Sequence, residues 1–197
     1  MISLLKNLHG RFYKLFLPWL VFPPGQTVNG QFLTYHRQNM ITFLNTWKPR
    51  LMGNVMDLGV GTWEYPRKLL KDQCHYLSVD TFYHPNVDLV ADAQHLDQYF
   101  EPDSWDFILC FDVLEHTQVP IDVINQARRL LKPGGMFLVT TPYFYPLHEN
   151  NQTKDYWRIS PEALQYLLAE KSGFSLVDVQ SQGNPKYPFT VTASAKK

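Results

Sequence analysis

The chain has 197 residues, about the length of one domain, and 45% of them are hydrophobic, which is enough for a buried core and unlike a disordered segment. Its 18 basic residues balance 18 acidic ones, and this zero net charge argues against a nucleic-acid partner held mainly by charge. The two cysteines, Cys74 and Cys110, lack metal-like neighbours at useful spacing. They indicate reduced thiols in a cytoplasmic protein and predict no metal.

The first 22 residues differ from the rest, because apolar side chains recur there at helical spacing among basic ones. The segment is too short and interrupted to span a bilayer, and it lacks the cleavage site of a signal peptide. It either touches an anionic membrane surface peripherally or packs on its own domain or a second subunit, and we prefer the second interpretation. We therefore divide the chain into an amphipathic extension (1–30) and one domain (31–197).

Residues 31–47 predict a helix that covers a ligand site, and beyond residue 54 short apolar runs alternate with helical patterns. The expected strands are 55–58, 76–80, 87–91, 105–111, 136–141, 174–180 and 189–195, and the expected helices are 65–72, 122–131 and 161–171. Ser160 should cap the last helix. This alternation is typical of a mostly parallel α/β sheet. Since residues 181–188 are too few for a crossover, the last two strands should pair antiparallel.

The most informative stretch follows the first of these strands and reads Asp-Leu-Gly-Val-Gly-Thr-Trp-Glu over residues 57–64. Gly59 and Gly61 let the backbone approach a ligand closely, and the following helix directs its N-terminal amides there. A dinucleotide fingerprint would need a glycine at Glu64, where a carboxylate disfavours pyrophosphate. Acids on both sides of the loop, Asp57 and Glu64, suit a cationic or zwitterionic ligand such as S-adenosylmethionine better than NAD.

Four further motifs follow this loop in order: Val79-Asp80, Ala91-Asp92-Ala93, the run Phe-Asp-Val-Leu-Glu-His over 111–116, and Arg-Leu-Leu-Lys-Pro-Gly-Gly over 129–135. With them, residues 54–195 resemble the class I S-adenosylmethionine-dependent methyltransferases, in particular the type-11-like small-molecule group. The resemblance implies a Rossmann-like, seven-stranded, mostly parallel sheet with an antiparallel final strand and helices on both faces. It implies an enzyme that methylates a small-molecule acceptor by in-line displacement; a catalytically idle module that binds the cofactor or a partner is the alternative.

The resemblance also assigns roles at the carboxyl ends of the strands, where ligands of open α/β sheets bind. It implies that the cofactor is bound by Asp57, Gly59, Gly61, Asp80 (through the ribose), Asp92 and Ala93 (near the adenine), Phe111 and Asp112. For Asp92, capping of a turn near residues 94–96 is an equal alternative. Trp63 stands where the family often has a third glycine, and we expect it to pack rather than to contact the ligand. His116 could be a base, but the resemblance favours a structural role.

A long segment separates the expected strand 136–141 from the helix at 161–171, and loops of this length are usually functional. We interpret it as the lid of an acceptor site. His148 is the candidate general base, and Tyr143, Tyr145 and Arg158 are candidate substrate contacts. Alternatively, Arg158 and its neighbour Trp157 dock the loop, and His148 is a surface residue. The side chains fit a sugar, a phenol or a carboxylate as acceptor.

Overall fold

The computed structural model describes residues 25–28, 31–147, 153–184 and 187–197. Its strands are β1 (Gly25–Val28), β2 (Gln31–Thr34), β3 (Asn54–Leu58), β4 (His75–Asp80), β5 (Leu89–Val90), β6 (Trp105–Phe111), β7 (Leu131–Pro142), β8 (Ser175–Asn184) and β9 (Tyr187–Lys196). Its α-helices are α2 (Tyr35–Trp47), α3 (Tyr65–Leu70), α4 (Pro120–Leu130) and α5 (Pro161–Gln165). The other helical turns are the 3₁₀ turns η1 (Lys48–Arg50), η2 (Leu96–Gln98) and η3 (Leu114–His116) and the π-helical turn η4 (Tyr166–Lys171).

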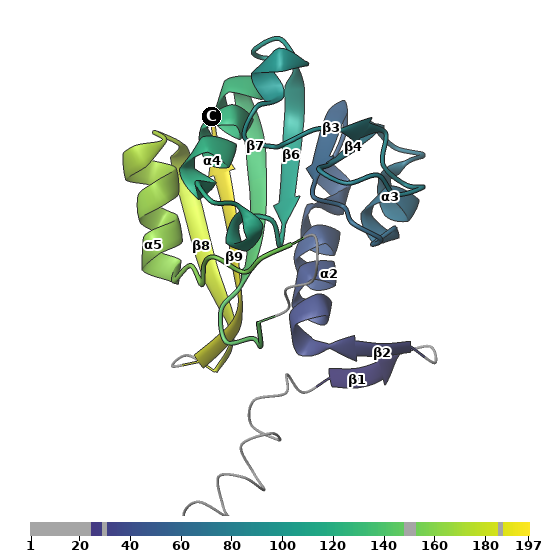
Figure 1. The fold of residues 1–197 in the computed structure, drawn as a ribbon, viewed down its shortest axis with the longest axis vertical. Helices are drawn as coiled ribbons and strands as arrows, with labels where there is room; N and C mark the ends of the chain where they lie inside the picture. The colour runs from purple at the N-terminus through teal and green to yellow at the C-terminus, as the bar shows by residue number, and fades with distance from the viewer. Residues whose placement is uncertain (1–24, 29–30, 148–152, 185–186) are drawn as a thin grey trace, which may run out of the picture.

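Seven strands form one twisted sheet in the order β5-β4-β3-β6-β7-β9-β8, and Figure 1 shows it running from β4 to β8. The first five strands in this order, β5, β4, β3, β6 and β7, pair in parallel. The strand β9 lies between β7 and β8 and is antiparallel to both. The predicted sheet with its antiparallel final strand is therefore confirmed.

Helices cover both faces of this sheet, because its central strands are apolar on both sides. On one face, Met40 and Leu44 of α2 pack with Leu109 of β6. On the other face, Ile124 of α4 and Leu164 of α5 pack in a second cluster, which contains Ile108 and Cys110 of β6. In Figure 1, α2 and α3 lie beside one side of the strands, and α4 and α5 cover the other. Alternate residues of a strand thus supply two cores.

The predicted helix at 31–47 is correct only from residue 35. Residues 31–34 form β2, which pairs antiparallel with β1 in a hairpin outside the main sheet. The helix begins where the Thr34 hydroxyl accepts a hydrogen bond from the Arg37 amide at 3.2 Å, which is an N-cap. The hairpin straddles the boundary at residue 31, and the division into 1–30 and 31–197 stays a prediction.

The ends of most other predicted elements differ by a few residues from those observed, and β7 begins five residues earlier than expected, at Leu131. Two further differences concern the kind or length of an element. The strand expected at 87–91 is shortened to β5, because only Leu89 and Val90 pair with β4. The helix expected at 161–171 begins as predicted, with the Ala163 amide donating to the Ser160 hydroxyl at 3.1 Å, but it continues as a π-helical turn after Gln165. Within the described ranges, no helix combines the length and apolar character that crossing a membrane requires.

Candidate active site

The loop between β3 and α3 lies at the carboxyl edge of the sheet, in the backbone conformation that its glycines predict. Gly59 and Gly61 have φ of 68° and 50°, a region that glycine adopts at little cost. A Cβ on Gly59 would lie 2.3 Å from the Val113 side chain, whereas one on Gly61 would have no neighbour within 4 Å. The loop is therefore packed tightly beneath Gly59 and open above Gly61, where a ligand can approach its backbone.

Asp57 lies beneath this loop at the end of β3 and is only 2% exposed. It accepts a hydrogen bond from the Tyr76 hydroxyl of β4. Burial raises the pKa of Asp57 to about 7, although the Tyr76 hydrogen bond and the nearby Arg67 act in the opposite direction. A carboxylate with this pKa would be favoured in its charged form by a cationic ligand group nearby.

Asp80 joins the end of β4 to the same loop. Its Oδ2 accepts a hydrogen bond from the Gly61 amide at 2.8 Å, and its Oδ1 accepts one from the Phe82 amide at 2.9 Å. Each carboxylate oxygen can accept more than one hydrogen bond, so capacity for ribose hydroxyls remains. Asp92 accepts a hydrogen bond from the Gln94 amide at 2.9 Å, which is the turn-capping role given above as its alternative. Its neighbour Ala93 is buried in the core, and the cofactor contacts of Asp92 and Ala93 stay predictions.

Trp63, the residue that departs from the family pattern, packs as expected. Its ring stacks on Tyr65 with centroids 5.9 Å apart, and the Arg37 guanidinium of α2 lies 4.3 Å from its centroid. The next residue, Glu64, pairs with Lys68 one helical turn later. Because this pairing compensates the charge of Glu64, that residue argues less strongly against pyrophosphate than the sequence suggests.

Asp112 follows β6 and joins three elements at the edge of the sheet. His36 of α2 donates from Nε2 to its Oδ2 at 2.7 Å, and the Thr140 hydroxyl of β7 donates to its Oδ1 at 3.0 Å. The other nitrogen of His36, Nδ1, is 2.7 Å from the Thr190 hydroxyl of β9, which also accepts from Asn39 at 3.1 Å. Burial works to raise the pKa of Asp112, but His36 and Arg37 hold it below its ordinary value.

Phe111, the last residue of β6, is buried and faces α2. Its ring lies 6.1 Å from that of Phe43. This contact places Phe111 in the core between sheet and helix, and its predicted contact with the cofactor stays a prediction.

The segment 153–158 is docked on η3 and the residue after it by backbone amides and by side chains. The Tyr156 and Trp157 amides both donate to the carbonyl of Glu115, and the Trp157 indole donates to the Thr117 carbonyl at 2.8 Å. His116 Nδ1 lies 3.0 Å from Asp155 Oδ1. The structural role that we favoured for His116 and the docking role of Trp157 are therefore both present.

Arg158, a candidate substrate contact, is held in the same loop. It pairs with Asp155 Oδ2 at 2.7 Å and donates to the Pro146 carbonyl at 3.2 Å. Tyr145 lies with its ring 5.2 Å from that of His36, and Tyr143 donates its amide to the Phe189 carbonyl at 3.1 Å. The structure thus brings Tyr145 and Arg158 to the carboxyl edge of the sheet. Contacts of Tyr143, Tyr145 and Arg158 with a substrate stay predictions, and His148 lies outside the described residues.

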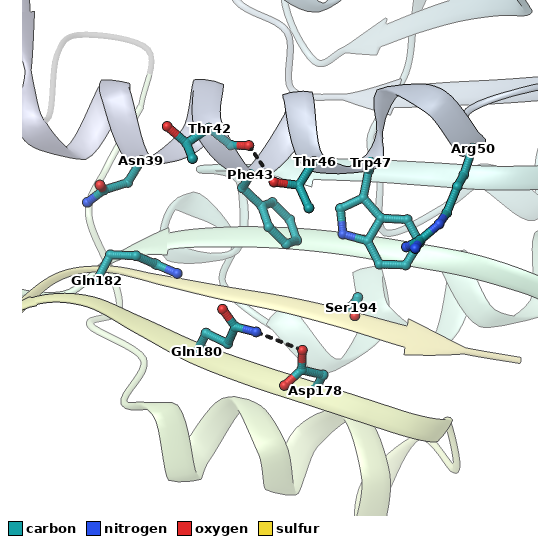
Figure 2. A pocket seen from close by; sticks show the side chains of 10 residues that line it. All are labelled: Asn39, Thr42, Phe43, Thr46, Trp47, Arg50, Asp178, Gln180, Gln182 and Ser194. Atoms are coloured by element: carbon teal, nitrogen blue, oxygen red, sulfur yellow. Dashed lines mark hydrogen bonds between the residues drawn. The ribbon is translucent and has the colours of Figure 1, made fainter.

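A pocket of about 260 Å³ lies between α2 and the strands β8 and β9, as Figure 2 shows. Asn39, Thr42 and Thr46 line it from the helix, Gln180 and Gln182 line it from β8, and Arg50 closes one end. The glycine loop contributes no residue to it. This pocket is therefore separate from the cofactor site expected at β3 and β4.

His36 and Arg37 are the residues at this edge that the sequence interpretation missed. Both come from the first turn of α2, and their only signal in the sequence is their place in a stretch, 1–56, that contains no acidic residue. Cys74 and Cys110 are free thiols. In the part of the chain that the structure describes, no group of three or more His, Cys, Asp or Glu is placed to hold a metal ion.

The sequence matches a family model and curated proteins that are all methyltransferases. A family model described as a methyltransferase domain matches residues 32–178. Ubiquinone biosynthesis O-methyltransferases of Yersinia pestis (strain Pestoides F) and Yersinia pseudotuberculosis (strain IP 31758) are each 24% identical over 158 residues, which cover 72% of this chain. The match spans 62% of the length of these relatives.

Solved structures share the fold at low sequence identity. The Burkholderia thailandensis 1,6-didemethyltoxoflavin-N1-methyltransferase, with bound 1,6-didemethyltoxoflavin and S-adenosylhomocysteine, has a TM-score of 0.64 at 19% identity and covers 80% of this chain and 77% of its own. A methyltransferase from Archaeoglobus fulgidus has a TM-score of 0.63 at 16% identity, covering 81% and 94%. Haemonchus contortus phosphoethanolamine N-methyltransferase 2, in complex with S-adenosylmethionine, has a TM-score of 0.61 at 18% identity, covering 81% and 52%.

Proposed function

Since the chain belongs to the methyltransferase domain family, we propose that it transfers a methyl group from S-adenosylmethionine to a small-molecule acceptor. The observation that carries the proposal is the β3–α3 loop, whose two glycines have positive φ at the carboxyl edge of the sheet. Asp57 beneath the loop and Asp80 beside it supply the acidic groups.

The residues of this edge fit the cofactor. The space above Gly61 leaves room for a ligand against the backbone, and buried Asp57 favours a positively charged group such as an ammonium. Asp80 retains acceptor capacity for the ribose. When bound, S-adenosylmethionine supplies a methyl group on a sulfonium, with a neutral thioether as the leaving group. The chain's own residues then mainly align the acceptor and exclude water.

We propose a phenol as the acceptor. The relatives are O-methyltransferases of ubiquinone biosynthesis, and Tyr145 offers an aromatic ring beside His36 at this edge of the sheet. A phenol loses its hydroxyl proton during methyl transfer, and His148 is our candidate for the base that accepts it. Arg158 would act by holding the lid through Asp155.

Calorimetry with S-adenosylmethionine and NAD, followed by transfer of labelled methyl to a panel of phenols, sugars and amines, tests the proposal. We expect S-adenosylmethionine to bind, NAD not to bind, and label to appear on a phenol. Tight NAD binding without S-adenosylmethionine binding would refute the proposal. Cofactor binding without transfer to any acceptor in cell metabolite extracts would favour the second candidate, an idle binding module of the same fold.

For residues 1–22 we propose packing on the domain itself or on a second subunit, in a cytoplasmic protein. The alternative is peripheral membrane contact, which the basic residues Lys6, Arg11 and Lys14 would favour on an anionic surface. Sedimentation with anionic phospholipid vesicles, with and without residues 1–22, separates the two. Binding that requires the segment would overturn the packing proposal.

A further inference from the structure

The first turn of α2 contacts two parts of the cofactor site that are distant in sequence. His36 reaches Asp112 after β6, 76 positions away, and Arg37 lies over Trp63 in the glycine loop. Asp112 and the glycine loop are themselves adjacent, because Gly59 packs against Val113. The helix turn therefore spans the same edge at which the cofactor is proposed to bind.

The hydrogen bonds around His36 fix the direction of its ring. Asp112, whose pKa is held low, can only accept, so Nε2 carries a hydrogen and donates to it. Nδ1 meets the Thr190 hydroxyl, which already accepts from Asn39. Both ring nitrogens are thus engaged by the protein, and the imidazole is 4% exposed beneath Tyr145. His36 can therefore orient Asp112, whereas its own ring is not available to contact a substrate.

The conformation of Asp112 has to be stabilised by the residues around it. Asp112 has φ of 57°, a conformation that few residues other than glycine adopt, and its carboxylate is mostly removed from water. A non-glycine residue in this region at a binding edge keeps its geometry only where the surroundings fix it. The donors from His36 and Thr140 supply that constraint.

We propose that His36 is a positioning residue for the cofactor, which acts by holding Asp112 ionised and correctly oriented toward the positive end of S-adenosylmethionine. The inference rests on the proposed function, because it assumes this cofactor. It adds that α2 is part of the cofactor site itself and does more than cover the sheet.

The charged and titratable groups that face Asp112 determine what loss of His36 should do. They are His36 and Arg37 on α2, Cys110 on its own strand and Glu115 in η3. Without His36, burial opposes the charge on Asp112 and only Arg37 and Thr140 still favour it, so Asp112 should take up a proton at a higher pH than in the wild type. Cofactor affinity should then fall more steeply as the pH is lowered.

Calorimetry of S-adenosylmethionine binding between pH 5.5 and 8.0 tests this with three variants of the full chain. His36→Ala should weaken binding about tenfold at pH 7.5, the expected effect of losing one hydrogen bond to a charged group, and more at pH 5.5. His36→Gln, whose amide nitrogen can occupy the Nε2 position, should restore most of the affinity. Met40→Ala, a buried residue on the same helix, should lower stability without a pH-dependent change in affinity.

The outcomes separate this inference from the proposed function. Wild-type protein that fails to bind S-adenosylmethionine refutes the function and the inference with it. Wild-type binding with unchanged affinity in His36→Ala, or with a loss that is the same at every pH and is not restored by glutamine, refutes only the positioning role. A pH-dependent loss restored by glutamine and absent from Met40→Ala supports it.

Discussion

The buried carboxylate of Asp57 makes the stability of the protein depend on pH in a direction unusual for an aspartate. Its pKa is about 7 in the folded chain against an ordinary value of 3.8. The folded state therefore holds this proton more tightly than the unfolded state, so the stabilisation is complete below pH 4 and is lost as the pH rises toward 7. At about 1.4 kcal/mol per pKa unit, the total is about 4 kcal/mol, and about 3 kcal/mol of it is lost between pH 5 and 8.

Asp57→Asn removes this titration while keeping an oxygen that can accept from Tyr76. We expect the wild type to lose about 3 kcal/mol relative to the variant between pH 5 and 8, because every other titrating group is common to both proteins. Urea denaturation of both proteins at several pH values, without ligand, measures this difference.

Asp106→Asn is the matched control. Lys132 holds the pKa of Asp106 below its ordinary value, despite partial burial, so its titration lies below this pH window and the difference from wild type should be flat. Parallel pH profiles for the wild type and Asp57→Asn would refute the reasoning. They would show that Asp57 stays ionised in the folded chain throughout the range.

Four further substitutions test the glycine loop, the cap of α5 and the segment 153–158. Gly59→Ala should cost about 2–4 kcal/mol in urea denaturation, because positive φ and contact with Val113 combine, whereas Gly61→Ala should cost only about 1–2 kcal/mol from φ; equal losses would contradict the packing. Ser160→Ala should cost about 1 kcal/mol by loss of the helix cap, and no change in thermal unfolding would argue against the cap. Arg158→Ala should speed amide hydrogen exchange across 153–158 and leave that of α2 unchanged; unaltered exchange in the loop would remove its docking role.

The fold could be predicted from the sequence because its determinants are local. The alternation of apolar runs with helical patterns identifies the strands, and the short connection 181–188 indicates the antiparallel pair. The hairpin β1–β2 was the exception, although the Asn29-Gly30 pair between residues 25–28 and 31–34 is a typical hairpin signal in the sequence.

The site could be predicted only where a motif marks it. The glycine loop, Asp57 and Asp80 are recognisable because their chemistry lies within short runs at strand ends. His36 belongs to no such run, and its partners Asp112 and Thr190 are 76 and 154 positions away. Contacts of this kind arise from the packing of α2 on β6 and β9, which no local pattern in one sequence encodes.

The position of β9 has a consequence for the order of folding. This strand is formed by residues 187–196 but lies inside the sheet, where it separates β7 from β8. During synthesis on the ribosome, β3 to β7 can assemble as soon as they emerge, but β8 has no sheet partner until β9 follows. Since the pairing of β7 with β9 joins residues far apart in sequence, such as Met136 and Lys196, it is intrinsically slow. Until this pairing forms, the nascent chain exposes the unpaired edge of β7. A chaperone would bind at this edge, or a strand of another chain would pair with it.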